Sequence, residues 1–187
     1  NLPERRGPAF ARDRSLSSTE GEIIAFLDSD CIVPQDWLAK INTEFNRDIS
    51  GIGGKYELPR DINSISGLFM AYWDPKNIFY KMPVSLISLS GGNCAFWKSA
   101  LMRDRKKQEL IYCNRAVGGD DTIMCYELSK TGRLIYSPDI SVIHNKKSSL
   151  LSILRETISL GYSGAIISTV CGNSLIKEPH RLYKSIL

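Results

Sequence analysis

A buried strand followed directly by two acids is the feature of this chain from which a fold class can be predicted. The run Ile23-Ile24-Ala25-Phe26-Leu27 is apolar without interruption and leads into Asp28-Ser29-Asp30. An unbroken apolar run, rather than an alternating one, is typical of a strand buried on both faces of an α/β sheet. Asp28 and Asp30 are two residues apart, so an extended backbone points both side chains the same way. We predict that they stand at the carboxyl end of a parallel strand, where open α/β sheets bind their ligands.

Two carboxylates at such a position favour a divalent cation. Oxygen ligands select hard ions, so the expected cofactor is Mg²⁺ or Mn²⁺, and Mg²⁺ sites commonly combine one or two carboxylates with the phosphates of a substrate. The alternative interpretation is a polar strand end that begins a turn, for which Asp and Ser are also suited. This segment alone leaves both interpretations open.

The composition is that of a globular protein with one sizeable core. Of its 187 residues, 43% are hydrophobic and 24% are charged, which excludes a disordered or fibrous chain. The net charge of +4 can attract a phosphate-bearing ligand or an anionic membrane surface. The basic residues are scattered, apart from a short run at 103–107 that we interpret as a solvated surface, and we expect no nucleic-acid partner.

The cysteines do not indicate a disulfide framework. Their number is odd and no two of them form a C-x-x-C pair, so the sequence predicts neither paired disulfides nor a zinc site. They are Cys31, Cys94, Cys113, Cys125 and Cys171. Reduced thiols fit a cytoplasmic protein.

The C-terminal part of the chain contains the one segment whose composition approaches that of a membrane span. Apolar residues between 150 and 158 fall on one helical face, and Ser148 or Ser149 can cap that helix. Residues 158–176 carry no charge and approach the length of a membrane span, but they are rich in Ser, Gly and Thr. We therefore expect a helix that packs on the domain or lies at a membrane interface, which places the protein in the cytoplasm or at the cytoplasmic face of the membrane.

Helical and strand-like patterns alternate along the rest of the chain. We expect helices at residues 7–18, 35–46, 98–107 and 122–130, and strands at 49–57, from 93 onward, at 133–137 and at 140–144. Pro8 suits a first helical turn and Gly132 a helical end. The core face of the second helix is expected to consist of Trp37, Leu38, Ile41 and Phe45. Residues 61–83 predict a helix and an irregular loop whose aromatic side chains either pack in the core or form a platform for a sugar.

A second acidic segment, Gly118-Gly119-Asp120-Asp121, precedes the helix expected at 122–130. The macrodipole of a helix stabilises acids at its N-terminus, which is a complete structural explanation for both of them. The functional alternative is that the same dipole keeps one carboxylate ionised and ready to accept a proton. His144 is likewise either a satisfied structural residue at a strand end or, as a neutral imidazole, a ligand for a transition metal.

Taken together, four motifs resemble those of the family 2 glycosyltransferases, which have the GT-A fold. They occur in the family's order: D-S-D-x3-P-x2-W-L from Asp28, G-G-N-x-A-F from Gly91, G-G-D-D from Gly118, and L-I-Y-x-P followed by His144. A further segment, residues 7–12, resembles the family's G-x-x-x-A-R. The resemblance covers residues 1–144, and no single motif would support it alone.

The resemblance assigns expected roles to individual residues. The segment at 28–30 matches the family's D-x-D motif, which implies that Asp30 and His144 hold the cation. Asp28 is expected to contact the ribose or a metal-bound water. Asp120-Asp121 matches an E-D motif, with Asp in place of the usual Glu, and implies Asp121 as general base and Asp120 as the residue that positions the acceptor. Contacts to the sugar and the diphosphate are expected from the backbone of Gly91, Gly92 and Asn93 and from Arg12.

The fold implied by the resemblance is α/β: the Rossmann-like mixed sheet of nucleotide-diphospho-sugar transferases, flanked by helices. Residues 1–147 are expected to form a partial GT-A domain and residues 148–187 a C-terminal helical extension. The family's first strand-helix-strand unit, which binds the nucleotide base, would lie before Asn1, so activity of this piece alone is left open. The Q-x-x-R-W motif of processive synthases does not follow His144, which argues against a polysaccharide synthase.

The reaction implied by the resemblance is metal-dependent transfer of a sugar to an acceptor hydroxyl, with inversion at the anomeric carbon. The donor is expected to be a nucleotide diphosphate sugar, with UDP as the nucleotide, and the cation Mn²⁺ or Mg²⁺. The acceptor would be a glycan, a lipid-linked molecule or a protein. A hexosyltransferase of cell-envelope glycan biosynthesis, in peripheral contact with a membrane, fits these expectations.

Two other functions remain open at this point. An apolar strand that ends in D-x-D also begins phosphatases of the haloacid dehalogenase type, in which Asp28 would be the nucleophile and Asp30 the acid. Against that hypothesis, no clear lysine motif precedes the later acids, and His144 would have no role. The chain can also be a catalytically inactive remnant that binds a partner or a membrane, although it retains acids in both motifs.

Overall fold

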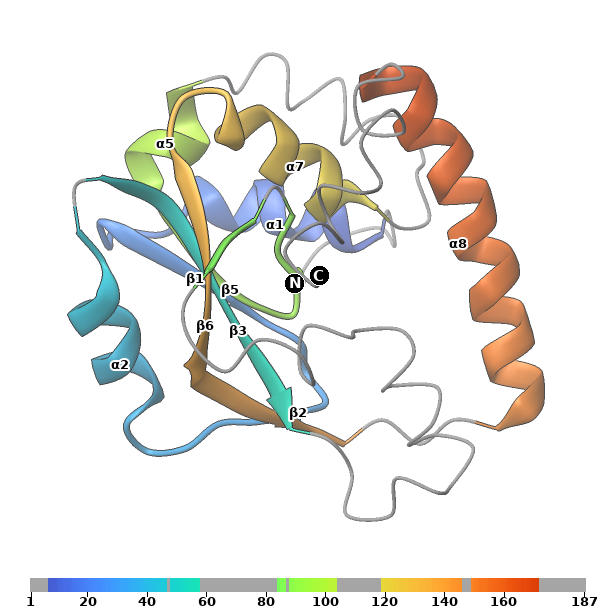
Figure 1. Cartoon of the computed structure of the whole chain (residues 1–187), viewed down its shortest axis with the longest axis horizontal. Helices are drawn as coiled ribbons and strands as arrows, with labels where there is room; N and C mark the ends of the chain where they lie inside the picture. Colours follow the sequence, from blue (N-terminus) through green and yellow to red (C-terminus); the bar gives the residue numbers. More distant parts are fainter. Residues whose placement is uncertain are drawn as a thin grey trace.

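The computed structural model describes residues 7–46, 48–57, 84–86, 88–103, 119–145 and 149–171 (Figure 1). These residues form a mixed sheet with helices on both of its faces. Several predictions fall on residues outside this set: the helix and aromatic loop at 61–83, the last turn of the helix at 98–107, Cys113, Gly118 and the end of the apolar segment at 172–176.

The sheet has the strand order β1-β5-β3-β6-β2, and β4 pairs with β6. The strands are β1 (Ile23–Leu27), β2 (Cys31–Ile32), β3 (Ile49–Glu57), β4 (Val84–Leu86), β5 (Asn93–Trp97) and β6 (Arg133–His144). β3 and β6 run parallel, and the other described pairings are antiparallel. The expected mixed α/β sheet is therefore present, and β3 has the predicted bounds.

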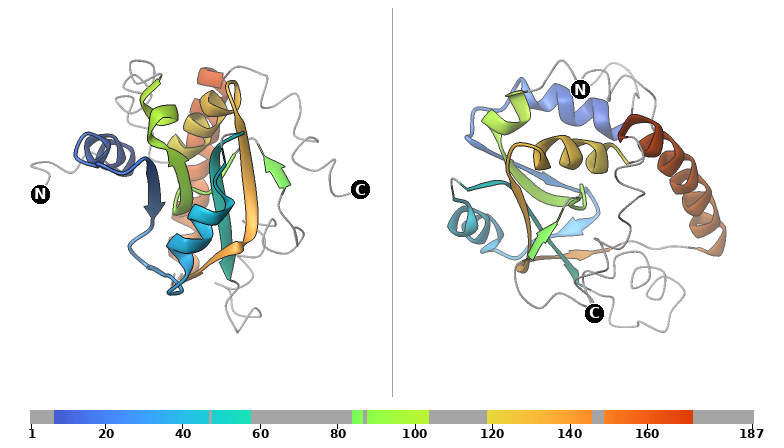
Figure 2. Two further views of the ribbon diagram at one scale, coloured as in Figure 1. Left: turned by 90° about the vertical axis from the view of Figure 1, so that its left-hand side faces the viewer. Right: turned by 45° about the horizontal axis from the view of Figure 1, so that its top comes forward.

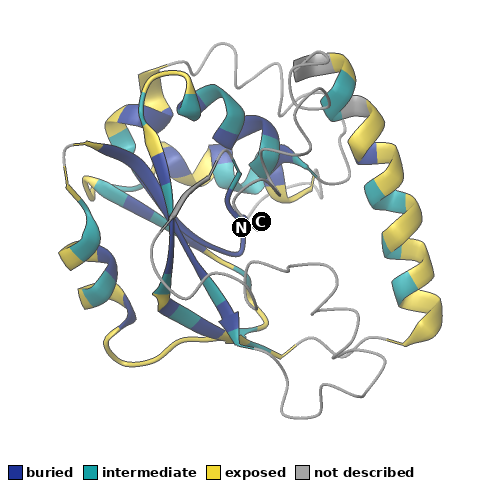
Figure 3. Cartoon of the chain, viewed as in Figure 1, coloured by how far each residue is buried: buried dark blue, intermediate teal, exposed yellow. Residues whose placement is uncertain are grey.

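Two apolar layers cover the sheet, one on each face. The helices are α1 (Pro8–Leu16), α2 (Trp37–Glu44), α5 (Lys98–Arg103), α7 (Asp120–Ser129) and α8 (Leu150–Cys171). Side chains of α1, α5 and α7 pack on one face with Phe26, Phe96 and Tyr136. Trp37 and Ile41 of α2 pack on the other face, with residues of β3 and β6. Figure 3 shows the resulting buried strands between half-buried helices.

The prediction for β1 was wrong in two respects. Among the described strands β1 pairs only with β5, antiparallel, from Ile23 opposite Trp97 to Leu27 opposite Asn93. It therefore lies at one edge of the described sheet, with α1 beside it (Figure 2). The burial of its side chains also alternates. Ile24 and Phe26 are buried, whereas Ile23 and Ala25 are half-buried and Leu27 is 39% exposed. The apolar run is continuous in sequence, but its strand is not equally buried on both faces.

Residues 133–144 form one strand, β6, rather than the two strands predicted around Pro138. The pairing with β3 shifts between Gly54, opposite Ser137, and Lys55, opposite Ser141, so the intervening residues form a bulge. A bulge can accommodate a proline without ending the strand. A side chain at Gly54 would overlap the carbonyl oxygen of Ile140, so glycine is needed where the bulge approaches β3. The bulge lets β6 continue to His144 at the edge that carries β2.

The helices begin close to where the sequence predicts. α1 has Pro8 in its first turn and buries Ala9 and Leu16, as expected. α2 begins at Trp37, later than predicted, and Leu38 is 65% exposed, so its assignment to the core was wrong. After α7, the amide of Gly132 donates to the carbonyl of Leu128, which agrees with a helical end at this glycine.

α8 stands beside the domain and contacts it near its C-terminal end (Figures 1 and 2). Gly119, which precedes α7 with a φ of 82°, lies so close to Ile167 that a side chain there would overlap it. Ser149 accepts a hydrogen bond from the amide of Ser152, which confirms it as the cap of α8. The segment Leu150–Thr169 has the length and composition of a membrane span, with a mean hydropathy of 1.2, and only 6% of it is buried. One such helix is weak evidence for a crossing.

Candidate active site

The two acidic segments meet at the turn formed by Gly91 and Gly92. The carbonyl of Gly92 accepts a hydrogen bond from the amide of Asp28 (3.1 Å). The amide of Gly91 donates to Oδ2 of Asp121 (2.9 Å). One two-residue turn thus fixes the acid that follows β1 and the acid at the start of α7. The sequence predicted both acidic segments, and the structure brings them together.

Neither glycine has room for a side chain. A Cβ on Gly91 would lie 2.9 Å from the Cβ of Asp121 and 3.1 Å from a guanidinium nitrogen of Arg12. A Cβ on Gly92 would overlap the carboxylate of Asp28 and lie 2.6 Å from the hydroxyl of Tyr56. The two glycines are therefore required for the acids to approach the backbone this closely.

Arg12 of α1 joins the two acidic segments electrostatically. Its Nη1 donates to Oδ2 of Asp120 (2.6 Å), and its Nη2 donates to the carbonyl of Gly91 (3.3 Å). The same Nη2 lies 3.9 Å from Oδ1 of Asp28. Burial alone would lower the pKa of Arg12, but the neighbouring acids, with Asp120 foremost, raise it above its ordinary value. Arg12 is therefore a permanent cation that donates to Asp120 and to the Gly91 carbonyl.

Asp120 is an interior acid. Its side chain is 10% exposed, and Arg12 holds the carboxylate. Burial raises the pKa of Asp120 above its ordinary value, Arg12 partly offsets this effect, and Asp121 adds to it. A carboxylate bound in this way has little access to an acceptor, so the expected role of positioning the acceptor does not fit the geometry. Asp120 instead anchors Arg12.

Asp121 remains the acid of α7 that is open to a ligand. It is half-buried, and its two oxygens accept hydrogen bonds from the amides of Gly91 (2.9 Å) and Thr122 (2.8 Å). Asp121 lies in the first turn of α7, at the positive N-terminal end of that helix. A carboxylate that is fixed in this way and open to a ligand can accept a proton, and the role of Asp121 as a base stays a prediction.

The expected cation ligands lie side by side, Asp30 directly before β2 and His144 at the end of β6. Nε2 of His144 is 3.2 Å from Oδ1 of Asp30. The ring of Tyr56 lies against the imidazole, with 5.1 Å between the ring centroids. Two ligands that share one cation at about 2.1 Å would be about 3 Å apart, so the residues fit a divalent ion.

Cys31 is the third donor at this point. One donor atom each from Asp30, Cys31 and His144 lie within 4.8 Å of one another. The thiol is half-buried and makes a weak hydrogen bond to the carbonyl of Gly92 (3.9 Å). Burial and the carboxylates of Asp28 and Asp30 raise the pKa of Cys31 to about 11, so the thiol is protonated in the cation-free protein.

The side chain of Asn93 is bonded within the protein, and the expected sugar contact from its backbone stays a prediction. The residue is fully buried, and its side-chain oxygen accepts a hydrogen bond from the indole of Trp37 (3.1 Å). Its side-chain nitrogen donates to the carbonyls of Lys55 (3.1 Å) and Ile140 (3.0 Å). Asn93 therefore connects α2, β3 and β6 behind the site.

Sequence reasoning missed Tyr56 and Cys31. Tyr56 is buried at the end of β3, where the structure sets it against His144 and near Gly92. Its place in the expected strand at 49–57 was visible, but its partners are distant in sequence. Cys31 directly follows the D-x-D motif, and that adjacency to the expected ligands was the available signal.

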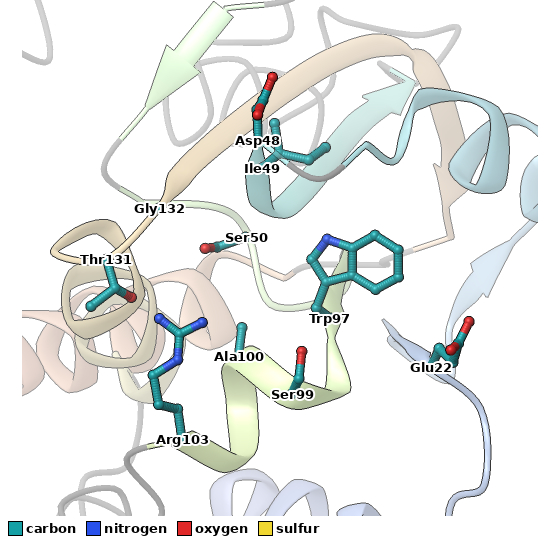
Figure 4. A pocket seen from close by; sticks show the side chains of 10 residues that line it. All are labelled: Glu22, Asp48, Ile49, Ser50, Trp97, Ser99, Ala100, Arg103, Thr131 and Gly132. Carbon is teal, nitrogen blue, oxygen red and sulfur yellow. The ribbon is translucent and has the colours of Figure 1, made fainter.

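A shallow pocket of about 470 Å³ lies at the other end of the sheet (Figure 4). Ile49 at the start of β3, Trp97 at the end of β5 and Gly132 before β6 line it. The acids and His144 follow the opposite ends of these strands, so this pocket is separate from the candidate site. Its charged residues are two acids, Glu22 and Asp48, and one base, Arg103, so its charge does not favour an anion such as a phosphate.

Comparison with known families finds one match. The model of the family described as Glycosyl transferase family 2 matches residues 1–105. No curated protein matches the chain. The family match covers the D-x-D segment, Arg12 and the Gly91-Gly92 turn, whereas α7 and His144 lie beyond it.

Two solved structures share the fold. A mannosyltransferase from Pyrobaculum calidifontis, in complex with GDP-Man and Mn²⁺, has a TM-score of 0.55 and 22% identity over 83% of this chain and 45% of its own. Glucosyl-3-phosphoglycerate synthase from Mycobacterium tuberculosis, in complex with Mn²⁺, UDP and phosphoglyceric acid, has a TM-score of 0.53 and 18% identity over 91% of this chain and 56% of its own. The chain thus spans about half the length of the solved proteins it matches, and identities this low show the fold alone.

Proposed function

Because the chain belongs to glycosyl transferase family 2, we propose that its acidic site transfers a sugar from a nucleotide diphosphate sugar to an acceptor hydroxyl. The observation that supports this function best is the joining of the two acidic segments at Gly91 and Gly92. Sugar transfer needs one acid to bind the donor and another to take the proton of the acceptor. The Gly91-Gly92 turn holds Asp28 and Asp121 close enough to serve one site. The solved proteins of the same fold contain GDP-Man or UDP, together with Mn²⁺.

Asp30 and His144 are the proposed ligands of the cation, because their donor atoms are 3.2 Å apart and Asp30 is half-exposed. Mn²⁺ or Mg²⁺ bound there supplies positive charge that stabilises the leaving diphosphate. Asp28, which is also half-exposed, is proposed to contact the ribose or a water on the cation. Arg12 organises this edge through Asp120 and Gly91 and is also proposed as a contact to the diphosphate.

Asp121 is the proposed general base. The acceptor oxygen bonds to the anomeric carbon while the bond from that carbon to the diphosphate breaks, and the acceptor proton passes to Asp121. The electron pair of the broken bond leaves with the nucleoside diphosphate. Attack from the face opposite the leaving group inverts the anomeric carbon. A positioned base of this kind contributes roughly 10²–10⁴-fold to the rate.

The donor nucleotide, the acceptor and the location are part of the same proposal. We favour a UDP-sugar as donor and a glycan, lipid-linked molecule or protein as acceptor, in cell-envelope glycan synthesis at the cytoplasmic face of a membrane. Residues 1–147 would carry the donor and base sites, and residues 148–187 would form the helical extension. The phosphatase hypothesis gave His144 no role, whereas the structure sets it beside Asp30.

Nucleotide binding and turnover of two variants test the proposal. Asp30→Asn is expected to weaken Mn²⁺-dependent binding of a UDP-sugar by at least roughly tenfold, because a cation ligand is lost. Asp121→Asn is expected to retain that binding but to lower transfer by roughly 10²–10⁴-fold. Asp36→Asn is the matched control, since Asp36 is an exposed acid paired with Lys40 outside the site. Unchanged binding in Asp30→Asn contradicts the cation site, and binding without any transfer in the parent chain favours an inactive binding module.

A further inference from the structure

Three donors of different chemistry converge beside the Gly91-Gly92 turn. A carboxylate oxygen of Asp30, the thiol sulfur of Cys31 and an imidazole nitrogen of His144 all lie within 4.8 Å of one another. The proposed function uses the oxygen and the nitrogen but gives the sulfur no role. A thiol beside two cation ligands changes which cation the site prefers, because thiolates bind soft and borderline ions far better than hard ones.

Backbone pairing sets this convergence. Cys31 of β2 lies directly opposite His144 of β6 in an antiparallel pair, and opposed residues in such a pair project to the same side of the sheet. The amide of Asn145 donates to the carbonyl of Asp30 (2.9 Å), which continues the pairing into the D-x-D turn. All three donors therefore belong to paired backbone segments.

The sulfur is also free to turn toward its neighbours. Its described contact is the weak hydrogen bond to the carbonyl of Gly92, at 3.9 Å, which costs little to release. On coordination, the thiol proton passes to solvent and the thiolate contributes a negative charge. Cys, His and Asp are each ordinary zinc ligands, and three protein ligands leave a fourth position open for a phosphate or water.

We propose that Asp30, Cys31 and His144 form a three-donor site that takes Zn²⁺ or Co²⁺ in preference to Mn²⁺ and Mg²⁺. This inference rests on the proposed function for its biological use, since the same position would hold the cation of the donor. The physical basis is separate: Zn²⁺ and Co²⁺ gain a sulfur ligand here, whereas Mn²⁺ and Mg²⁺ are served by Asp30 and His144 alone. Cys31 therefore determines cation selectivity.

Titration of the whole chain with Co²⁺, without nucleotide, tests the inference. Sulfur coordination is expected to produce a thiolate-to-cobalt charge-transfer band in the near ultraviolet, together with the visible bands of tetrahedral Co²⁺. Cys31→Ser is expected to abolish the charge-transfer band and to weaken Zn²⁺ binding by at least roughly tenfold, with Mn²⁺ binding, followed by electron paramagnetic resonance, changed less than about twofold. The double variant Cys113→Ser/Cys171→Ser is the control for other thiols and is expected to keep the band.

The outcomes of the titration separate the metal site from the proposed function. The inference is overturned if the parent chain shows no charge-transfer band, or if the band survives in folded Cys31→Ser. Circular dichroism verifies that the variant is folded. Cys31→Ala replaces the serine variant if that variant does not fold. Equal affinities of the parent chain for Zn²⁺ and Mn²⁺ also overturn it. A Cys31-dependent band without sugar transfer refutes the proposed function but supports the metal site, and Mn²⁺-dependent transfer without the band does the reverse.

Discussion

At the scale of single residues, the ion pair between Arg12 and Asp120 links the two acidic segments. Both side chains are largely buried, so removal of one charge leaves the other unpaired in the interior. Burial already holds the pKa of Asp120 above its ordinary value of 3.8, an effect that Arg12 partly offsets. The native state therefore binds more protons at this carboxyl than the unfolded chain does, and the free energy of unfolding falls as the pH rises through the raised native pKa.

Arg12→Met is expected to enlarge this effect. Without the guanidinium the native pKa of Asp120 rises further, so the loss of stability on going from acid to neutral pH becomes larger and extends to higher pH. At neutral pH the free energy of unfolding of the variant should be about 3 kcal/mol lower than that of the parent chain. Urea unfolding at a series of pH values measures this, and Arg12→Met/Asp120→Asn should lose the added pH dependence. An Arg12→Met variant with the parent's pH dependence would show that the pair is not coupled to folding.

At the scale of secondary-structure elements, the side chain of Asn93 connects strands that are distant in sequence. In sequence, G-G-N resembles a ligand-binding turn, and the two glycines do shape the site. The side chain of Asn93 instead bonds to carbonyls of β3 and β6 that lie 38 and 47 residues away. A pattern of neighbouring residues holds no information on such distant partners, so the sequence could not predict the structural role of this side chain.

Asn93→Ala should therefore act on stability rather than on ligand binding alone. It leaves the indole N–H of Trp37 and two carbonyls without their buried partner, which is expected to cost about 3 kcal/mol of unfolding free energy. Asn46→Ala is the matched control, since the side chain of Asn46 makes an exposed hydrogen bond to the amide of Asp48 and its loss should change stability by about 0.5 kcal/mol or less. Urea unfolding compares the stabilities of the two variants. Equal midpoints would contradict the role of Asn93 in connecting α2, β3 and β6.

The elements themselves were largely predictable, whereas their pairing was not. A strand-like run with glycines located β3, and Pro8 with the apolar residues that follow it located α1, because these signals depend on residues close in sequence. The edge position of β1 depends on β5, about 70 residues later in the chain, and the continuity of β6 depends on the bulge opposite Gly54. For the same reason the acids and His144 could be selected from their motifs, but the convergence of Cys31 on them could not.

At the scale of the whole molecule, α8 presents an apolar surface that the described domain does not cover. Leu150, Leu151, Leu154, Ile158 and Tyr162 are all more than half exposed. We expect the chain to cosediment with vesicles of anionic lipid, and Leu154→Glu to lower the bound fraction severalfold, because a charge on this surface opposes its burial in the interface. Leu38→Glu is the matched control: Leu38 is also more than half exposed, at 65%, but lies on α2, so its change should leave vesicle binding as in the parent chain. If both variants bind alike, α8 is not the membrane contact, and its apolar face must be covered by protein instead.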